Sequence, residues 1–138
     1  MYILDTNVIS ELRRPEKADA NVLQWASRVP VGQFYLSAIT IFEIERGIGL
    51  MARRDAGKAN SLRQWFDQNI LTIFESRIFA IDAAVAVRCA QLHLPDPQSD
   101  RDSFIAATAL VHGMTVVTRN AKDFEKAGVP LMNPWQSL

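Results

Sequence analysis

The sequence predicts an α/β fold in which helices cover both faces of a parallel sheet. The chain has 138 residues, 49% of them hydrophobic, which suits one domain over residues 1–138. Short apolar runs suited to buried strands alternate with longer amphipathic stretches of helical periodicity. Because parallel strands need crossover connections, which are usually helices, this alternation is typical of a layered α/β architecture.

The N-terminal part of the chain predicts one strand and two helices. Residues 2–5 begin with an apolar run that is too short for a helix and suits a buried strand. A helix follows, which Asn7 can cap and which Pro15 ends. Residues 22–29 then place apolar side chains on one face of a second helix, before Pro30 interrupts it.

The central part predicts a second strand and a pair of helices. Residues 34–36 are aromatic and apolar, and this strand runs into a helix capped by Ser37. The apolar positions of that helix recur at spacings of three and four: Ile41, Ile44, Ile48 and Met51. Glu43 lies off this stripe. Another helix is expected after Gly57, with Trp65 among its core residues.

The C-terminal part predicts two more helices and the remaining strands. Residues 70–81 fit either a strand or a loop, and Asp82 is expected to cap a helix that Pro95 ends. A further helix is expected to begin at Asp102 and to stop at Gly113. The last elements are a strand, a short helix and a second short strand, over residues 115–117, 120–126 and 131–132.

Composition narrows the possible partners and the compartment. Lys plus Arg and Asp plus Glu each number 15, so no overall positive field indicates a nucleic-acid partner. Locally, Arg46, Arg53 and Arg54 belong to a basic stretch that is either a contact surface or a solvated helix face. The single Cys89 cannot form an internal disulfide, and no uncharged stretch is long enough to span a bilayer. We therefore expect a cytoplasmic protein without a membrane segment.

Four acidic residues predict a metal site: Asp5, Glu43, Asp102 and Asp123. Each lies beside an apolar run, at an expected strand end or near a helix start. In a parallel sheet the crevice lies outside the carboxyl ends of the strands, so these side chains are expected to converge there. Carboxylates that converge repel one another unless a hard cation joins them, and Mg²⁺ or Mn²⁺ is the natural guest.

Each acid taken alone also has a local structural explanation. Asp5 suits an Asx turn or a helix cap, and Glu43 stands three residues after Thr40 as in a capping box. Asp102 and Asp123 follow Ser99 and Asn120 at the same spacing, which also imitates a capping box. Capping does not require the four acids to meet, and the sequence shows no pairing arginine for each of them. The joint placement is therefore the argument for a metal site.

The chain resembles the PIN-domain ribonucleases and, among them, the VapC toxins of bacterial toxin–antitoxin pairs, including the FitB-like branch. Four segments similar to the family's motifs carry the resemblance, in the family's order: Ile3-Leu-Asp5-Thr-Asn7-Val-Ile-Ser10, Ser37-Ala-Ile-Thr40-Ile-Phe-Glu43-Ile-Glu-Arg-Gly47, Asp102-Ser-Phe-Ile105-Ala-Ala-Thr-Ala109 and Thr118-Arg-Asn120-Ala-Lys-Asp123-Phe124. The tail Asn133-Pro134-Trp135 also resembles the ends of such chains. No acid expected by the family is missing.

The resemblance implies a three-layer α/β/α fold with a central parallel sheet of four to five strands. It also implies a ribonuclease that hydrolyses RNA phosphodiester bonds with Mg²⁺ or Mn²⁺. Asp5 and Asp102 would hold the metal, while Glu43 and Asp123 would act as ligands or position the water. The groups expected to orient these acids are Thr6, Thr118 and Asn120. The number of metal ions and the RNA that is cut stay open, and cleavage of DNA is not ruled out.

The resemblance further implies a small antitoxin that covers the site, and a homodimer of the toxin. The expected contact surface is residues 38–66, where Arg46, Arg53 and Arg54 could bind either the antitoxin or the RNA.

Two other functions compete with the nuclease. One is a phosphatase that uses Asp5 as its nucleophile. Such enzymes typically carry an Asp-x-Asp motif at this place, whereas residue 7 of this chain is Asn. The other is a PIN-fold module that binds a partner without catalysis. The presence of all four acids argues against this second alternative.

Overall fold

A computed structural model of the chain describes residues 1–136. Five parallel strands form the central sheet in the order β3-β2-β1-β4-β5. Their bounds are Tyr2–Leu4 for β1, Phe34–Ser37 for β2, Ile78–Phe79 for β3, Thr115–Val117 for β4 and Leu131–Met132 for β5. The sheet confirms the predicted parallel architecture, and β3 resolves the ambiguous stretch 70–81 as mostly loop with one very short strand.

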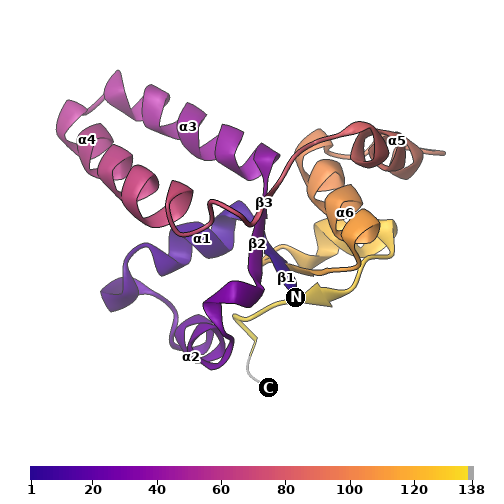
Figure 1. Ribbon diagram of the computed structural model, residues 1–138, viewed down its shortest axis with the longest axis horizontal. Helices are drawn as coiled ribbons and strands as arrows, with labels where there is room; N and C mark the ends of the chain where they lie inside the picture. The colour runs from indigo at the N-terminus through magenta and orange to yellow at the C-terminus, as the bar shows by residue number, and fades with distance from the viewer. Residues whose placement is uncertain (137–138) are drawn as a thin grey trace.

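Helices cover both faces of the sheet, which gives three layers (Figure 1). On one face lie α1 (Thr6–Leu12), α2 (Ala20–Arg28), α3 (Ala38–Ala52) and α4 (Ala56–Trp65), with the π-helical turn Phe66–Leu71. On the other face lie α5 (Ala83–Leu92), α6 (Asp100–His112) and the 3₁₀ helix Ala121–Ala127. Two further 3₁₀ turns, Pro15–Lys17 and Val31–Gln33, connect elements of the first face. Among residues 1–136, no helix is both long and apolar enough to cross a membrane.

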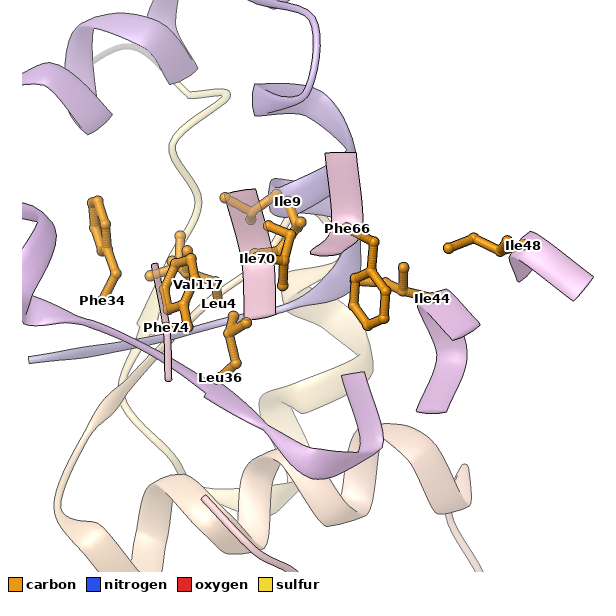
Figure 2. Packing of buried hydrophobic residues seen from close by; sticks show 11 residues of the cluster. Leu4, Ile9, Phe34, Leu36, Ile44, Ile48, Phe66, Ile70, Phe74 and Val117 are labelled. Atoms are coloured by element: carbon orange, nitrogen blue, oxygen red, sulfur yellow. The ribbon is translucent and has the colours of Figure 1, made fainter. Parts of the chain in front are cut away.

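The strands alternate their side chains between two hydrophobic clusters. Leu4 and Val117 point into the larger cluster, with helices α1 and α3, whereas Ile3 and Val116 point into the cluster against α6. Figure 2 shows how the larger cluster joins strand residues to side chains from the helices and the π-helical turn. A third cluster, around Val85, packs α5 on the outside of α6. Burial on both faces explains why the strands read as continuous apolar runs.

Several boundaries differ from those expected from the sequence. Asp5, not Asn7, is the N-cap of α1, because β1 ends at Leu4 and the helix begins at Thr6. Helix α6 begins at Asp100, so Asp102 lies within its first turn. The expected helix over 120–126 is a 3₁₀ helix, Ala121–Ala127. Caps at Ser37 and Asp82 are confirmed, since the side chain of each accepts a backbone hydrogen bond.

Sheet order fixes where a ligand can bind. Strand β1 pairs with β2 on one side and with β4 on the other. The later strands are therefore added on opposite sides of β1, with β2 and β3 on one side and β4 and β5 on the other. In open parallel sheets the crevice opens at such a switch point, beyond the carboxyl ends of the strands. The residues that follow β1 and β4, namely Asp5 and Thr118, therefore lie at its floor, and the backbone N–H of Asp5 donates to the carbonyl oxygen of Val117 (2.9 Å).

Gly113 ends α6 in the left-handed region, with φ of 68°, where a Cβ is strained. We expect Gly113→Ala to lower the free energy of unfolding by about 1 kcal/mol. Gly49 lies inside α3 with no atom within 4 Å of an added Cβ, so Gly49→Ala should raise the same quantity by about 0.5–1 kcal/mol. Urea unfolding of both variants measures the difference, and equal effects would contradict the assigned cap.

Candidate active site

All four predicted acids line one open hollow of about 540 Å³ at the switch point. Helix and strand ends from four parts of the chain meet there. The lining residues include the acids and eight others: Asp5, Glu43, Asp102, Asp123, Thr6, Asn7, Ser10, Glu11, Arg101, Arg119, Asn120 and Trp135. The predicted convergence of the acids is thus observed, although each of them belongs to a different element.

Asp5 is the most completely anchored of the acids. It is 8% exposed, its Oδ1 accepts from the backbone N–H of Thr6 (2.7 Å), and its Oδ2 accepts from the Thr118 hydroxyl (2.8 Å) and the Asn7 amide (3.3 Å). Burial raises the pKa of Asp5, the hydrogen bonds from Thr118 and Thr6 oppose this rise, and the charge of Glu43 adds to it. Asp5 therefore acts as a helix cap and also presents its carboxylate to the hollow.

Glu43 is held by two partners, one of which the sequence analysis missed. Its Oε1 accepts from the Thr6 hydroxyl (3.2 Å), and its Oε2 accepts from Nη1 of Arg101 (2.5 Å). The sequence shows no pairing arginine for each acid, and the structure pairs one of the four, Glu43, with Arg101. The pairing is invisible along the chain because Glu43 and Arg101 are 58 residues apart and meet only where α3 and α6 begin at the same edge of the sheet.

Asp102 and Asp123 carry no capping role in the described residues. The N-caps Ser99 and Asn120 make no side-chain capping bond, so neither capping box suggested by the spacing is formed. Glu43 likewise forms none, because Ser37 is the N-cap of α3. Burial, followed by the charges of Asp5 and Asp123, raises the pKa of Asp102 to about 6. The negative charges of Asp5 and Asp123 are therefore near enough to Asp102 to disfavour its ionised form.

Of the other predicted residues, Thr6, Thr118 and Asn120 lie at the site, whereas the three basic residues lie outside the hollow. The Thr118 hydroxyl is buried, donates to Asp5 and accepts from the backbone N–H of Asn120 (3.0 Å). Thr6 donates to Glu43 through its hydroxyl, whereas Asn120, among residues 1–136, bonds at the site only through its main chain. The basic residues Arg46, Arg53 and Arg54 do not line the hollow, and Arg46 instead lies over the ring of Phe42 (5.1 Å).

Two arginines and a tryptophan in the hollow were not singled out as site residues. Arg101 and Arg119 each stand next to a residue that was: Asp102 and Thr118. Their position next to predicted site residues was the signal in the sequence that could have identified the two arginines. The guanidinium of Arg119 lies over the ring of Trp135 (5.6 Å), whose backbone N–H donates to Oδ1 of Asn133.

The donor set fits a hard divalent cation, since it consists of carboxylates, hydroxyls and amides without a sulfur ligand. Burial and, after it, the charges of Asp5 and Asp123 raise the pKa of Asp102, and a bound cation would offset the repulsion by these charges. Within residues 1–136, however, no three acidic, histidine or cysteine side chains stand close enough to hold one ion in their present rotamers. The hollow therefore offers suitable ligands, and two of them, Asp5 and Glu43, are engaged with other groups of the protein.

Comparison with known proteins identifies the family. The model of the PIN domain matches residues 2–130. The chain belongs to the PIN-domain family. This confirms the resemblance seen in the four motifs and agrees with the three-layer fold.

Two curated proteins are similar to this PIN domain along its whole length. The protein named toxin FitB, from Neisseria gonorrhoeae, is 38% identical over 140 residues, which cover 98% of this chain and 99% of FitB. The protein named VapC ribonuclease Y4jK, from Sinorhizobium fredii, is 37% identical over 142 residues, 99% of each chain.

Solved structures agree with the fold of this PIN domain. A crystal structure of FitAcB from Neisseria gonorrhoeae superposes with a TM-score of 0.89 at 37% identity, and covers 99% of this chain and 100% of the matched chain. A toxin–antitoxin complex from Klebsiella pneumoniae gives 0.69 at 27% identity, with coverage of 99% and 100%. Similarity at this level extends over both helical layers and the sheet.

Removal of the charge at residue 102 should stabilise the metal-free protein. Because the folded-state pKa of Asp102 is raised from 3.8 to about 6, its stabilising contribution is full below pH 3.8 and is lost as the pH rises through 6. We expect Asp102→Asn to raise the melting temperature in chelator by about 2–5 °C at pH 7.5 and to have little effect near pH 4. Thermal unfolding at both pH values tests this. A lower melting temperature for the variant at pH 7.5 would contradict it.

Proposed function

We propose that this protein is a metal-dependent endoribonuclease toxin that a cognate antitoxin neutralises. One observation carries the proposal: the four predicted acids, which come from separate segments of a PIN domain, line a single hollow at the switch point of the sheet, with Glu11 as a fifth. Structural capping explains one of the four, Asp5, and none of the other three. The names of the full-length relatives, a toxin and a VapC ribonuclease, support the same activity.

In this proposal Asp5 and Asp102 hold Mg²⁺ or Mn²⁺. A divalent cation at this place supplies Lewis-acid polarisation of the phosphate and lowers the pKa of a bound water. Asp5 suits a ligand because the hydrogen bonds from Thr6 and Thr118 fix its carboxylate in one orientation. Asp102 suits a ligand because it is half-buried among like charges and has no hydrogen-bond partner among residues 1–136 that would have to be displaced.

The remaining groups would position water and substrate. Asp123 is exposed at the rim of the hollow, where it can accept the proton of the attacking water, and Glu43 can serve as a further ligand or orient that water. The water that has given its proton to Asp123 would add to the phosphorus as the bond to the leaving sugar oxygen breaks, and that oxygen would take up a proton from solvent water. Thr6, Thr118 and the main chain of Asn120 keep the acids oriented.

The proposed antitoxin would bind the face that α3 and α4 form over residues 38–66. Phe42 and Leu50 are 52% and 55% exposed on α3, so this helix presents apolar side chains that a partner could cover. The adjacent groove between α1 and the π-helical turn is lined by Leu12, Trp65 and Ile73 among others. Similarity to a chain of a toxin–antitoxin complex supports this partner. A homodimer of the toxin is part of the same proposal.

Two further parts of the proposal concern the chain as a whole. Residues 1–138 would form one domain, which the sharing of a single sheet by the hydrophobic clusters supports. The protein would work in the cytoplasm, where the buried, unpaired Cys89 stays reduced. The phosphatase alternative loses support, because the Asn7 amide donates to Asp5 at the place where a second acid would be needed.

The decisive experiment measures cleavage of structured RNA by the purified protein in Mg²⁺, Mn²⁺ or chelator. We expect cutting only with metal, and a loss of about a hundredfold or more in Asp5→Asn. Asparagine caps helices as well as aspartate does, so this variant should stay folded. Asp82→Asn is the matched control, because Asp82 caps α5 in the same way outside the hollow. No cutting under any condition by a folded protein would instead favour the binding module.

The basic surface is tested by a double variant, Arg53→Ala with Arg54→Ala. Both side chains are exposed at the end of α3, and loss of two charges should weaken binding of RNA or antitoxin by about threefold to tenfold in low salt. Arg88→Ala on α5 is the control, since Arg88 is an exposed arginine on the opposite helical layer. Binding by fluorescence anisotropy measures both affinities. If neither affinity changes, the basic stretch is only a solvated helix face.

A further inference from the structure

Both carboxylate oxygens of Glu43 are already occupied by groups of the protein itself. Oε1 accepts from the Thr6 hydroxyl and Oε2 from Nη1 of Arg101. The Glu43 side chain is 10% exposed, while that of Arg101 is 54% exposed. Thus the acid is fixed at the wall of the hollow, and the arginine reaches it from the solvent side. A ligand that binds Glu43 must first replace one of these two hydrogen bonds.

Arg101 is the cation that balances the acids of the hollow. Besides its ion pair with Glu43, Arg101 lines the same hollow as Asp5 and Asp102, so its positive charge lies near the whole cluster and not near Glu43 alone. Arg119 also lines the hollow, but its guanidinium lies over Trp135, and no ion pair to an acid is found for it within residues 1–136. Two of the four acids, Asp5 and Glu43, are therefore hydrogen-bonded by the chain, and only Glu43 has a cationic partner.

We propose that Arg101 is the resident counter-cation of the site, that it leaves Glu43 when a divalent cation binds, and that it thereby sets the metal affinity. The inference rests on the proposed function, because it takes the hollow to be a metal site. It explains why the acids line one hollow although no three of them stand ready to hold an ion. Since like charges repel, Arg101 and a divalent cation compete for the same carboxylate.

A second arginine–glutamate pair, between α4 and α3, provides a matched control. Arg63 on α4 donates to both oxygens of Glu45 on α3, two residues from Glu43, and these side chains are 41% and 54% exposed. Neither residue lines the hollow. Arg63→Gln therefore removes an arginine charge and its ion pair to the same helix, α3, without touching the acids of the hollow.

The test is calorimetric titration of Mn²⁺ into the wild type, Arg101→Gln and Arg63→Gln, together with thermal unfolding in chelator and in Mn²⁺. We expect Arg101→Gln to bind Mn²⁺ about tenfold more tightly, because an opposing unit charge is gone. Its melting temperature in chelator should fall, and the rise caused by Mn²⁺ should exceed that of the wild type. Arg101→Lys, which keeps the charge, should lie between them, and Arg63→Gln should match the wild type in Mn²⁺ affinity.

An Mn²⁺ affinity of Arg101→Gln equal to or weaker than that of the wild type would overturn the inference. So would an equal loss of melting temperature with and without Mn²⁺, which indicates only a structural link between α3 and α6. RNA cleavage separates the two proposals. If the wild type cuts RNA with metal while Arg101→Gln binds Mn²⁺ no more tightly than the wild type does, the nuclease proposal is supported and the counter-cation role of Arg101 is contradicted. If nothing is cut but the affinity rises in Arg101→Gln, the counter-cation stands and the nuclease falls.

Discussion

Repulsion among carboxylates at one edge of the sheet is the constraint that shapes this protein. The four predicted acids face one hollow, and their surroundings differ. Hydrogen bonds at a helix start hold the carboxylate of Asp5, an arginine pairs with Glu43, and burial together with nearby negative charges raises the pKa of Asp102. A stable fold would not collect these charges without another use for them, since each unpaired buried charge costs free energy. This cost supports the proposal that the hollow binds a cation.

The surrounding fold makes this concentration of charge possible. Two hydrophobic clusters on the two faces of the sheet hold β1 and β4 side by side, so that the residues after both strands meet. The bond from Thr118 to Asp5 crosses from one strand end to the other and links residues 113 positions apart. Side chains that come from strand ends and from helices keep their separation, which is the support that the proposed catalytic site would require.

Much of this arrangement was predictable because it depends on local patterns. Apolar runs at period two or in unbroken blocks marked the strands, and Ser37 and Asp82 marked helix starts through the preference of their side chains for backbone N–H groups. Boundaries were less certain. Asp5 competes with Asn7 for the cap of α1, and only the pairing of β1 with its neighbours decides where the strand ends.

The sequence by itself determined the layered α/β fold, the family and the four acids of the candidate site, because periodicity and motif spacing are properties of neighbouring residues. Only the tertiary structure decided the partners of those acids. Arg101 looks like one more surface arginine until α3 and α6 are placed at the same edge, where its reach across the hollow makes it the partner of Glu43. Contacts between distant segments depend on how the sheet orders its strands, and that order is set by packing across the whole core.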